Sequence, residues 1–522
     1  MTGGPEAAEA TETTGAKAAT AAHIRGSSLL FAGRLMSLLL NMATQVLIVR
    51  LLTKSDFGAF AYGLALIPAG RTLVSLGHQQ ALTRFLSLYE EERAYNKLFG
   101  TIVMEIGTIV STGLLLFAGL FALKGVLAGT AVSDPQAVVV LLILILLAPI
   151  EALEKVFEGI FAVFSRPRAV FFRRYVLTPG LRLLFVALLL AFGGSVTFLA
   201  AGYVAAGAFG IVTYAALSVH FFRRRGLLEH FHLRSIVMPF REVFGFALPL
   251  LSTELVNISM VTGTVVLLGH FAGAVEVAAY RAVLPTARLN QLVFWTFMLL
   301  FVPLATRMFA RGDREGMRDA YWRTAVWLAV FSFPVFVLTV PLAKPTTVAL
   351  FGDRYSDSAT VLALVSLGFY VNAALGYNAL TLQTYGKLRY VVTVNVIAGL
   401  TNVVLSFVLI PRQGALGAAI ANAVTLVLQN TLNQAGLAKG IGVPLFEWRY
   451  ARAYLVIIAA VLAVGAIQFA LSPPLVVGLG LAALASLVVF LANRDLLEME
   501  ATFPELTRVP LVRRLVASQT GT

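Results

Sequence analysis

The chain has 522 residues, of which 59% are hydrophobic and only 13% charged, and its mean hydropathy is +0.85. Soluble domains are about half apolar and about a quarter charged, so this composition excludes a disordered chain, a secreted disulfide scaffold and an ordinary soluble enzyme. A polytopic membrane protein remains. The net charge of +14 then indicates basic cytoplasmic loops rather than a nucleic-acid partner, and the absence of cysteine excludes disulfides and thiolate metal sites.

Apolar segments follow one another along the whole chain after a polar start. Residues 1–24 are rich in Ala, Thr, Gly and Glu and have almost no bulky apolar side chain, so we expect a disordered tail. A membrane crossing needs about 20 apolar residues, and the pattern predicts fourteen transmembrane helices. In chain order they cover 27–50, 57–77, 98–123, 137–158, 175–193, 196–220, 243–268, 278–306, 324–343, 358–381, 390–410, 414–436, 453–470 and 475–493.

Clusters of arginine determine the predicted orientation. Arg173 and Arg174 precede the fifth helix, Arg223–Arg225 follow the sixth, and Arg307 and Arg311 follow the eighth. Cytoplasmic loops are enriched in Lys and Arg, and these clusters all fall on one side when both termini are cytoplasmic. We therefore interpret them as topogenic charge and predict a multi-pass protein of the cytoplasmic membrane with both ends inside.

The predicted outer loops are all short, and the longest lies around Lys344–Asp357. Membrane-embedded glycan ligases and polymerases usually need a sizeable outer segment for acceptor binding and chemistry. The acidic residues available on this side are few, namely Asp134, Asp353 and Asp357. These loops disfavour such an enzyme, which stays an alternative hypothesis.

The two halves of the chain resemble each other at an offset of about 220 residues. Ala81–Phe85 is echoed by Leu304–Met308, and Phe164–Arg168 is echoed by Tyr385–Arg389. Six helices per half preserve the orientation, so we predict parallel repeats related by a pseudo-twofold axis along the membrane normal, as in many transporters.

This repeat divides the chain into two lobes and a C-terminal pair of helices. The predicted parts are a cytoplasmic tail at 1–24, an N-lobe at 25–220, a basic cytoplasmic linker at 221–242, a C-lobe at 243–436, two further helices at 437–493 and a cytoplasmic tail at 494–522. The linker is expected to form an interfacial amphipathic helix.

Short motifs in both halves resemble those of a known transporter family. They are Gly33-Arg34, Val49–Leu52 followed by Ser55–Gly58, Leu76-Gly77, Ala81–Phe85 and Phe246–Leu250. In this order the chain, over about residues 25–495, resembles the oligosaccharide-lipid flippases of the Wzx and polysaccharide-transport type. These belong to the multidrug/oligosaccharidyl-lipid/polysaccharide (MOP) exporter superfamily. The resemblance implies alternating access without enzymatic chemistry. One stretch departs from it, because Gly263–His270 lacks the aspartate that family members often carry there.

Charged residues also fall inside the predicted helices. They are Arg34, Arg71, Arg182, Arg281 and Arg288, with Glu105, Glu151 and Glu254. A charge at the centre of a lipid-facing helix costs about 2.5–3.5 kcal/mol on the insertion scale. Because the arginines outnumber the glutamates, a hydrated cavity lined by these residues would be basic and would suit an anionic substrate. Guanidinium groups match phosphate oxygens with forked donors.

The family resemblance implies that arginines of helices 1, 2 and 8 hold a lipid-linked pyrophosphate. We therefore predict Arg34, Arg71 and Arg288 as substrate ligands, with Arg281 as a fourth. The alternative for Arg34, Arg71 and Arg281 is snorkelling to the membrane surface. For Arg288 it is a buried ion pair with Glu254 of the preceding helix.

Uncharged polar residues extend this predicted site. Asn41 and Gln45 are four residues apart on helix 1 and share a face, with Arg34 on nearly the same side, so we predict that they bind sugar hydroxyls. The alternative is hydrogen bonding between packed helices. Glu254 and Asn257 form a candidate ion site or charge pair.

No nucleotide-binding P-loop motif occurs, and we predict neither a cofactor nor a metal site. The leading hypothesis is a flippase that moves a polyprenyl- or dolichyl-(pyro)phosphate-linked oligosaccharide from the cytoplasmic to the outer leaflet, for cell-surface polysaccharide or glycan assembly. Its expected partners are this substrate, membrane lipids, and glycosyltransferases or a polymerase of the same pathway, with no nucleic acid. The alternatives are a cation-coupled multidrug extruder of the same superfamily, a membrane-embedded glycan ligase or polymerase, and a membrane scaffold for glycan assembly.

Overall fold

The computed structural model describes residues 33, 36–77, 79–125, 135–164, 171–232 and 234–497 of the chain. Every regular element among these residues is a helix, so the prediction of an all-α polytopic membrane protein is confirmed. The chain divides into two compact units, Met1–Thr262 and Gly263–Thr522. The predicted tail at 1–24, Arg34 and most of the predicted tail at 494–522 lie outside the described residues.

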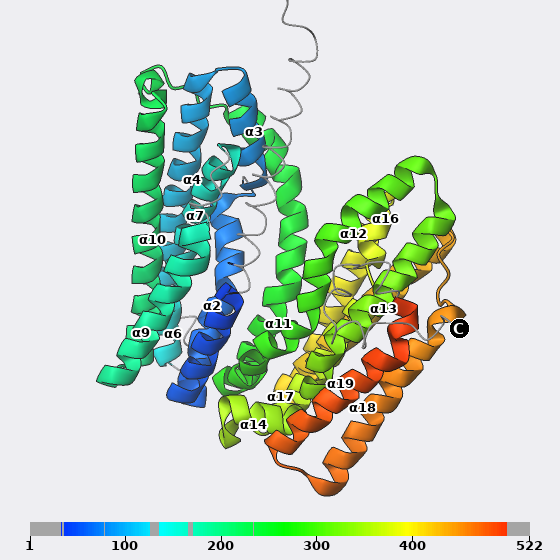
Figure 1. The fold of residues 1–522 in the computed structure, drawn as a ribbon. Coiled ribbons are helices and arrows are strands. Elements are labelled where there is room, and N and C mark those ends of the chain that lie inside the picture. Colours follow the sequence, from blue (N-terminus) through cyan, green and yellow to red (C-terminus); the bar gives the residue numbers. More distant parts are fainter. Residues whose placement is uncertain are drawn as a thin grey trace, which may run out of the picture. The chain divides into compact units, whose positions relative to one another are not determined.

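Unit 1 is a bundle of helices, most of them apolar (Figure 1). They are a first helix at Met36–Leu51, then α2 (Lys54–Ser75), α3 (Gln79–Glu91), α4 (Tyr95–Ala122), α6 (Pro135–Leu144), α7 (Leu147–Val163), η1 (Phe172–Leu177), α9 (Thr178–Phe192) and α10 (Val196–Arg224). α2 packs against α4, α6 and α7, and α10 packs against α6, α7 and α9. Thr53 caps α2 by accepting the backbone N–H of Asp56 at 3.1 Å, which satisfies a free donor at the helix start.

The segment after α10 differs from its prediction. It contains η2 (Leu227–His230), a single 3-10 turn, and the residues described from there to Phe240 are not helical. Gly226 has a φ of 68°, a left-handed conformation that favours glycine and ends helices. The prediction of an amphipathic helix over the linker is therefore wrong. The turn packs onto α4 instead, where the ring of His230 stacks on Tyr95 at 4.6 Å.

α11 (Phe240–Arg288) begins in unit 1 and ends in unit 2. The other elements of unit 2 are η3 (Leu289–Gln291), α12 (Leu292–Arg311), α13 (Arg314–Thr339), α14 (Ala343–Phe351), η4 (Asp353–Tyr355), α15 (Ser358–Ala374), α16 (Asn378–Thr384), α17 (Leu388–Gly440), η5 (Trp448–Tyr450), α18 (Ala451–Leu471) and α19 (Leu475–Leu497). The predicted loop around Lys344–Asp357 thus contains the short helix α14 and the turn η4.

Two very long helices each join a pair of predicted crossings. α11 continues through Gly273, where φ is 83° and ψ is 179°, and α17 continues through Gly414, where φ is 53° and ψ is −129°. Both backbone conformations are non-helical and accessible mainly to glycine. The glycines therefore turn the chain between crossings without a separate loop.

The number of crossings stays a prediction. Eleven helices among the described residues are long and apolar enough to cross a membrane, and the shorter apolar helix Met36–Leu51 is a further segment. Two of the eleven, at 50 and 53 residues, are more than twice as long as a single crossing of about 20 residues requires.

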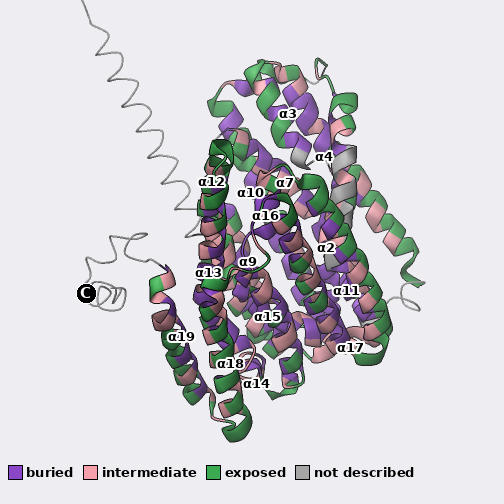
Figure 2. Ribbon diagram, turned by 90° about the vertical axis from the view of Figure 1, so that its right-hand side faces the viewer, coloured by how far each residue is buried: buried purple, intermediate pink, exposed green. Residues whose placement is uncertain are grey.

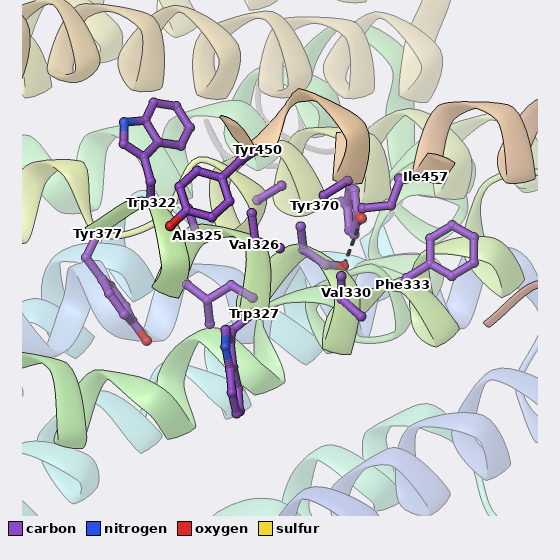
Figure 3. Close-up of a cluster of buried hydrophobic side chains, with 14 of the residues drawn as sticks. Trp322, Ala325, Val326, Trp327, Val330, Phe333, Tyr370, Tyr377, Tyr450 and Ile457 are labelled. Atoms are coloured by element: carbon purple, nitrogen blue, oxygen red, sulfur yellow. Dashed lines mark hydrogen bonds between the residues drawn. The ribbon is translucent and has the colours of Figure 1, made fainter. Parts of the chain in front are cut away.

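The core of unit 2 is built around α13 (Figure 3). Trp322, Val326 and Phe333 are completely buried there. Tyr370 of α15 stacks on Phe336 with ring centroids 3.7 Å apart and donates to the carbonyl of Ala329 at 2.9 Å. α18 and α19 both pack against α13 and cover it. Many of their own residues are exposed, and these are green in Figure 2.

Candidate substrate-binding site

The first predicted polar stripe is only partly described. Asn41 is exposed and donates to Ser37 Oγ at 3.0 Å, one turn earlier on the same helix. Gln45 is half-buried, and Arg34 lies outside the described residues. Asn41 thus bonds within its own helix.

A three-residue charge cluster lies inside unit 1. Nη1 of Arg71, on α2, is 3.4 Å from Glu151 Oε2, on α7, and Nη2 of Arg182, on α9, is 3.9 Å from the other oxygen of the same carboxylate. Arg182 also lies over the ring of Tyr203, on α10, at 5.0 Å. The structure therefore joins the predicted ligand Arg71 to two charges that were not assigned to the site.

A second cluster in unit 1 corrects the interpretation of Arg173. This residue was interpreted as topogenic charge, yet its side chain is only 2% exposed and pairs with Glu154 of α7. It also donates to Thr178 and lies 5.0 Å from the Tyr214 ring. Arginine clusters in sequence do not show which member turns inward, because that depends on the rotation of the helix.

The third carboxylate of α7 lies near the end of the helix. Glu158 accepts from Lys155 at 2.6 Å and is 3.6 Å from Arg174. Glu151, Glu154 and Glu158 recur at helical spacing, so they share one face of α7. This acidic stripe is the signal from which the partners of the arginines could have been predicted.

The predicted ligands of unit 2 lie at the end of α11. Arg281 is half-buried and Arg288 is exposed, and within the described part of unit 2 neither guanidinium has a hydrogen-bond or ion-pair partner. They are seven residues apart, which is about two helical turns, so they share a face of α11. Arg288 ends the helix just before the 3-10 turn η3. The helix geometry thus brings the two predicted arginines of this unit to one side.

Buried and half-buried amide side chains connect the helices on either side of η3 to their neighbours. Asn290 donates to Thr339 Oγ1 at 3.1 Å, and Gln291 donates to Asn372 Oδ1 at 2.8 Å. The Asn430 side chain accepts from Asn372 at 3.3 Å and from Asn378 at 2.9 Å. This network crosses from η3 to α15, α16 and α17, and the sequence pattern did not reveal it because these residues are far apart in the chain.

The candidate ion site remains a prediction. Glu254 is half-buried on the part of α11 that belongs to unit 1, and the side chain of Asn257 is not described. The alternative ion pair of Arg288 with Glu254 joins residues of different units. Glu276 of unit 2 has a defined role instead, since its carboxylate accepts the backbone N–H of Ala415 at 2.7 Å, next to the turn at Gly414. Among the described residues, three or more His, Cys, Asp or Glu side chains nowhere come together as a metal site.

The sequence matches models of two known protein families. A model of the polysaccharide biosynthesis protein family matches residues 24–309, which is more than half of the sequence. The chain belongs to the polysaccharide biosynthesis protein family. The resemblance drawn from its motifs is thereby confirmed. A model of the MatE family also matches residues 249–408, within the second half. No curated protein matches the chain.

Solved transporter structures share the fold of this chain. The lipid II flippase MurJ in an inward closed conformation is similar with a TM-score of 0.69 and 14% identity, over 90% of this chain and 99% of that one. An inward-facing multidrug resistance MATE family transporter of the MOP superfamily gives 0.57 and 15%, over 77% and 95%. The MATE multidrug transporter DinF-BH gives 0.52 and 15%, over 80% and 97%. At this identity the matches show a common fold.

Proposed function

We propose that this protein is a flippase for a polyprenyl- or dolichyl-(pyro)phosphate-linked oligosaccharide, which it moves from the cytoplasmic to the outer leaflet for cell-surface polysaccharide or glycan assembly. The observation that carries the proposal is the set of arginines within apolar helices of a polysaccharide biosynthesis family member. Arg71 and Arg182 lie in unit 1, and Arg281 and Arg288 lie in unit 2. Charges in such helices are costly unless they serve a hydrated path or a polar ligand.

In the proposed mechanism Arg71, Arg281 and Arg288 bind the phosphate groups, while Arg34, Asn41 and Gln45 of the first helix complete the site for phosphate and sugar. The lipid tail remains in the bilayer. The two lobes rock alternately toward each face, which moves the glycan across without exposing it to hydrocarbon. Transport of this kind needs no covalent chemistry, so we propose a transporter and not an enzyme.

The proposal also implies where the protein lies and which enzymes act before and after it. It would lie in the cytoplasmic membrane with both termini inside, as the arginine clusters predict. Glycosyltransferases that build the lipid-linked glycan would supply its substrate, and a polymerase or ligase would consume the product at the far face. The match of MurJ, which is described as a lipid II flippase, supports this class of substrate.

Headgroup translocation in proteoliposomes tests the proposed function. Wild-type protein should move a lipid-linked oligosaccharide, and Arg71→Ala or Arg288→Ala should reduce the initial rate about tenfold or more, because a charge-assisted contact to phosphate is lost. Arg412→Ala is the matched control, since Arg412 is exposed and its Nη1 donates to Val408 O on its own helix. Undiminished transport in both variants would contradict the assigned site, and no transport by wild type would contradict the function.

A cation-coupled multidrug extruder is the second candidate, because the MatE model matches residues 249–408. Such a protein would move a cationic dye against its gradient when a sodium or proton gradient is imposed. The described arginines disfavour cationic cargo in the site. Dye transport without headgroup translocation would support this candidate over the flippase.

A further inference from the structure

We propose that Arg71 and Arg182 form a single anion seat, which the carboxylate of Glu151 occupies in this structure and a phosphate group of the substrate takes over during transport. This inference rests on the proposed function and deepens it. It adds Arg182 and Glu151 to the substrate path, and it assigns Glu151 the role of an internal competitor for the anion.

The contacts of Glu151 are ion pairs that are long for charge-assisted hydrogen bonds. Its oxygens lie 3.4 Å from Arg71 and 3.9 Å from Arg182, whereas charge-assisted N–H···O bonds are about 2.7–2.9 Å long. On the same helix, Glu158 lies 2.6 Å from Lys155. Glu151 is therefore held loosely between two cations and can be displaced at a smaller cost than a tightly bonded carboxylate.

The two guanidinium groups also have unused donors. Nε of Arg71 and Nε of Arg182 are buried, and neither has a hydrogen-bond partner among the described residues. Each guanidinium offers five N–H donors, so one carboxylate leaves most of them unbonded. A phosphate group presents more oxygens and more negative charge, and it would satisfy donors that Glu151 does not reach.

The seat is reachable, although it lies well inside apolar helices. The exposed fractions of Arg71, Glu151 and Arg182 are 24%, 26% and 27%. Glu151 lies within the apolar span Ala137–Val163 and Arg182 within Phe172–Phe192. A charge cluster facing lipid at this depth would be unstable, so its exposed side faces water or a polar ligand.

Neighbouring contacts favour exchange at this cluster over the Arg173–Glu154 pair of the same helix. Tyr203 lies 5.0 Å from the guanidinium of Arg182, a cation–π contact that keeps the guanidinium in place when Glu151 withdraws. Arg173, by contrast, is 2% exposed against Glu154. That pair is enclosed and we assign it a structural role.

Equilibrium binding to purified protein tests the seat, with farnesyl pyrophosphate and inorganic pyrophosphate as probes. Glu151→Gln should bind farnesyl pyrophosphate about tenfold more tightly, because the neutral amide competes less for the arginines. Arg182→Ala should bind farnesyl pyrophosphate about tenfold more weakly. If the alanine variant does not fold, Arg182→Lys is measured in its place. Glu158→Gln is the matched control, since Glu158 is also a carboxylate of α7 shared by two cations, and its affinity should equal that of wild type.

The gain of affinity in Glu151→Gln is the decisive result, because loss of a purely structural ion pair would not tighten binding. An equal gain for both probes assigns the seat to the phosphate group alone, and a gain limited to farnesyl pyrophosphate assigns it to the lipid-linked form. Unchanged or weaker binding in a folded Glu151→Gln protein overturns the seat. If wild type still translocates the headgroup, the proposed function survives that result; if wild type neither binds nor translocates, the proposed function fails as well.

Discussion

The guanidinium of Arg173 is enclosed by three elements of unit 1. Arg173 itself lies in the π-helical turn η1, and its guanidinium pairs with Glu154 on α7 and lies against Tyr214 on α10. Gly210 of α10 provides the space, because a Cβ atom added there would overlap Arg173 Nη2. Sequence alone placed Arg173 in a cytoplasmic loop, since neither the turn of η1 nor the glycine opposite can be read from local hydropathy.

Gly210→Ala should therefore destabilise unit 1. The added methyl group displaces the guanidinium from Glu154, and overpacking together with a weakened buried ion pair should lower the free energy of unfolding by about 2 kcal/mol or more. Thermal unfolding in detergent measures the effect. Gly180→Ala in α9 is the control, because a Cβ there meets no atom within 4 Å and alanine favours a helix. Equal stability of the two variants would contradict this account.

The carboxylate of Glu242, at the start of α11, should make the stability of the protein depend on pH. Its carboxylate accepts from Tyr89 at 2.6 Å and from Lys97 at 3.2 Å, and these hydrogen bonds lower its pKa below the usual 4.5. A lowered folded-state pKa stabilises the protein above pH 4.5, and this contribution is lost as the pH falls through the lowered value. Glu242→Gln should thus lose less thermal stability than wild type between pH 7 and pH 3. The same acid-induced loss in both proteins would exclude a role for this carboxylate.

Among the elements, the two glycine turns in α11 and α17 differ in their surroundings. A Cβ at Gly273 would meet no atom within 4 Å, whereas one at Gly414 would overlap Glu276 Oε2. Both positions have positive φ, so alanine is strained at either. Only at Gly414 would it also disturb the carboxylate that accepts the N–H of Ala415.

Gly414→Ala should consequently be more destabilising than Gly273→Ala. We expect about 1 kcal/mol from backbone strain at Gly273 and at least about 1 kcal/mol more at Gly414, because the hydrogen bond from Ala415 to Glu276 is lost as well. Unfolding midpoints of the two variants in the same detergent provide the comparison. A larger loss for Gly273→Ala would show that Glu276 does not secure the turn.

Hydropathy predicts the membrane helices well but not the breaks within them. The predicted segments 453–470 and 475–493 differ from α18 and α19 by a few residues, because an apolar run of this length has few other structures in a membrane. The breaks at η3 and between α15 and α16 were not predicted, since polar amide contacts rather than apolar residues determine them. In the candidate site, Arg71 is predicted from its charge within an apolar helix, but its contact with Glu151 and the position of Arg182 beside the same carboxylate depend on how three helices are rotated.

At the scale of the whole molecule, arginines within apolar helices occur in both units, and no cysteine occurs anywhere. The first feature agrees with the anionic cargo that we propose. The second makes the topology directly testable, because any introduced thiol will be the only one in the protein. The predicted orientation, with both termini cytoplasmic, can therefore be checked one position at a time.

Asp353→Cys and Arg225→Cys should respond oppositely to a membrane-impermeant maleimide in intact cells. Asp353, in η4, lies in a predicted outer loop and should be labelled, whereas Arg225, after α10, is on the predicted cytoplasmic side and should be labelled only after permeabilisation. The unmodified chain gives the background signal. Labelling of Arg225→Cys alone in intact cells would show that the orientation is the reverse of the predicted one. Labelling of both variants would contradict the predicted alternation of inner and outer loops.

The burial of α13 has a consequence for how the chain is made. α18 and α19 pack against this helix, and Trp327 donates its indole N–H to the carbonyl of Leu497 at 3.1 Å. About 110 residues separate the end of α13 from the start of α18, and at roughly 5–20 residues per second the ribosome needs on the order of ten seconds to synthesise them. During that interval a helix that carries Ser332 and Thr339 on its buried surface waits in the bilayer or the translocon without its final neighbours. Stalling or truncation before α18 would therefore leave a nascent chain that membrane quality control can recognise.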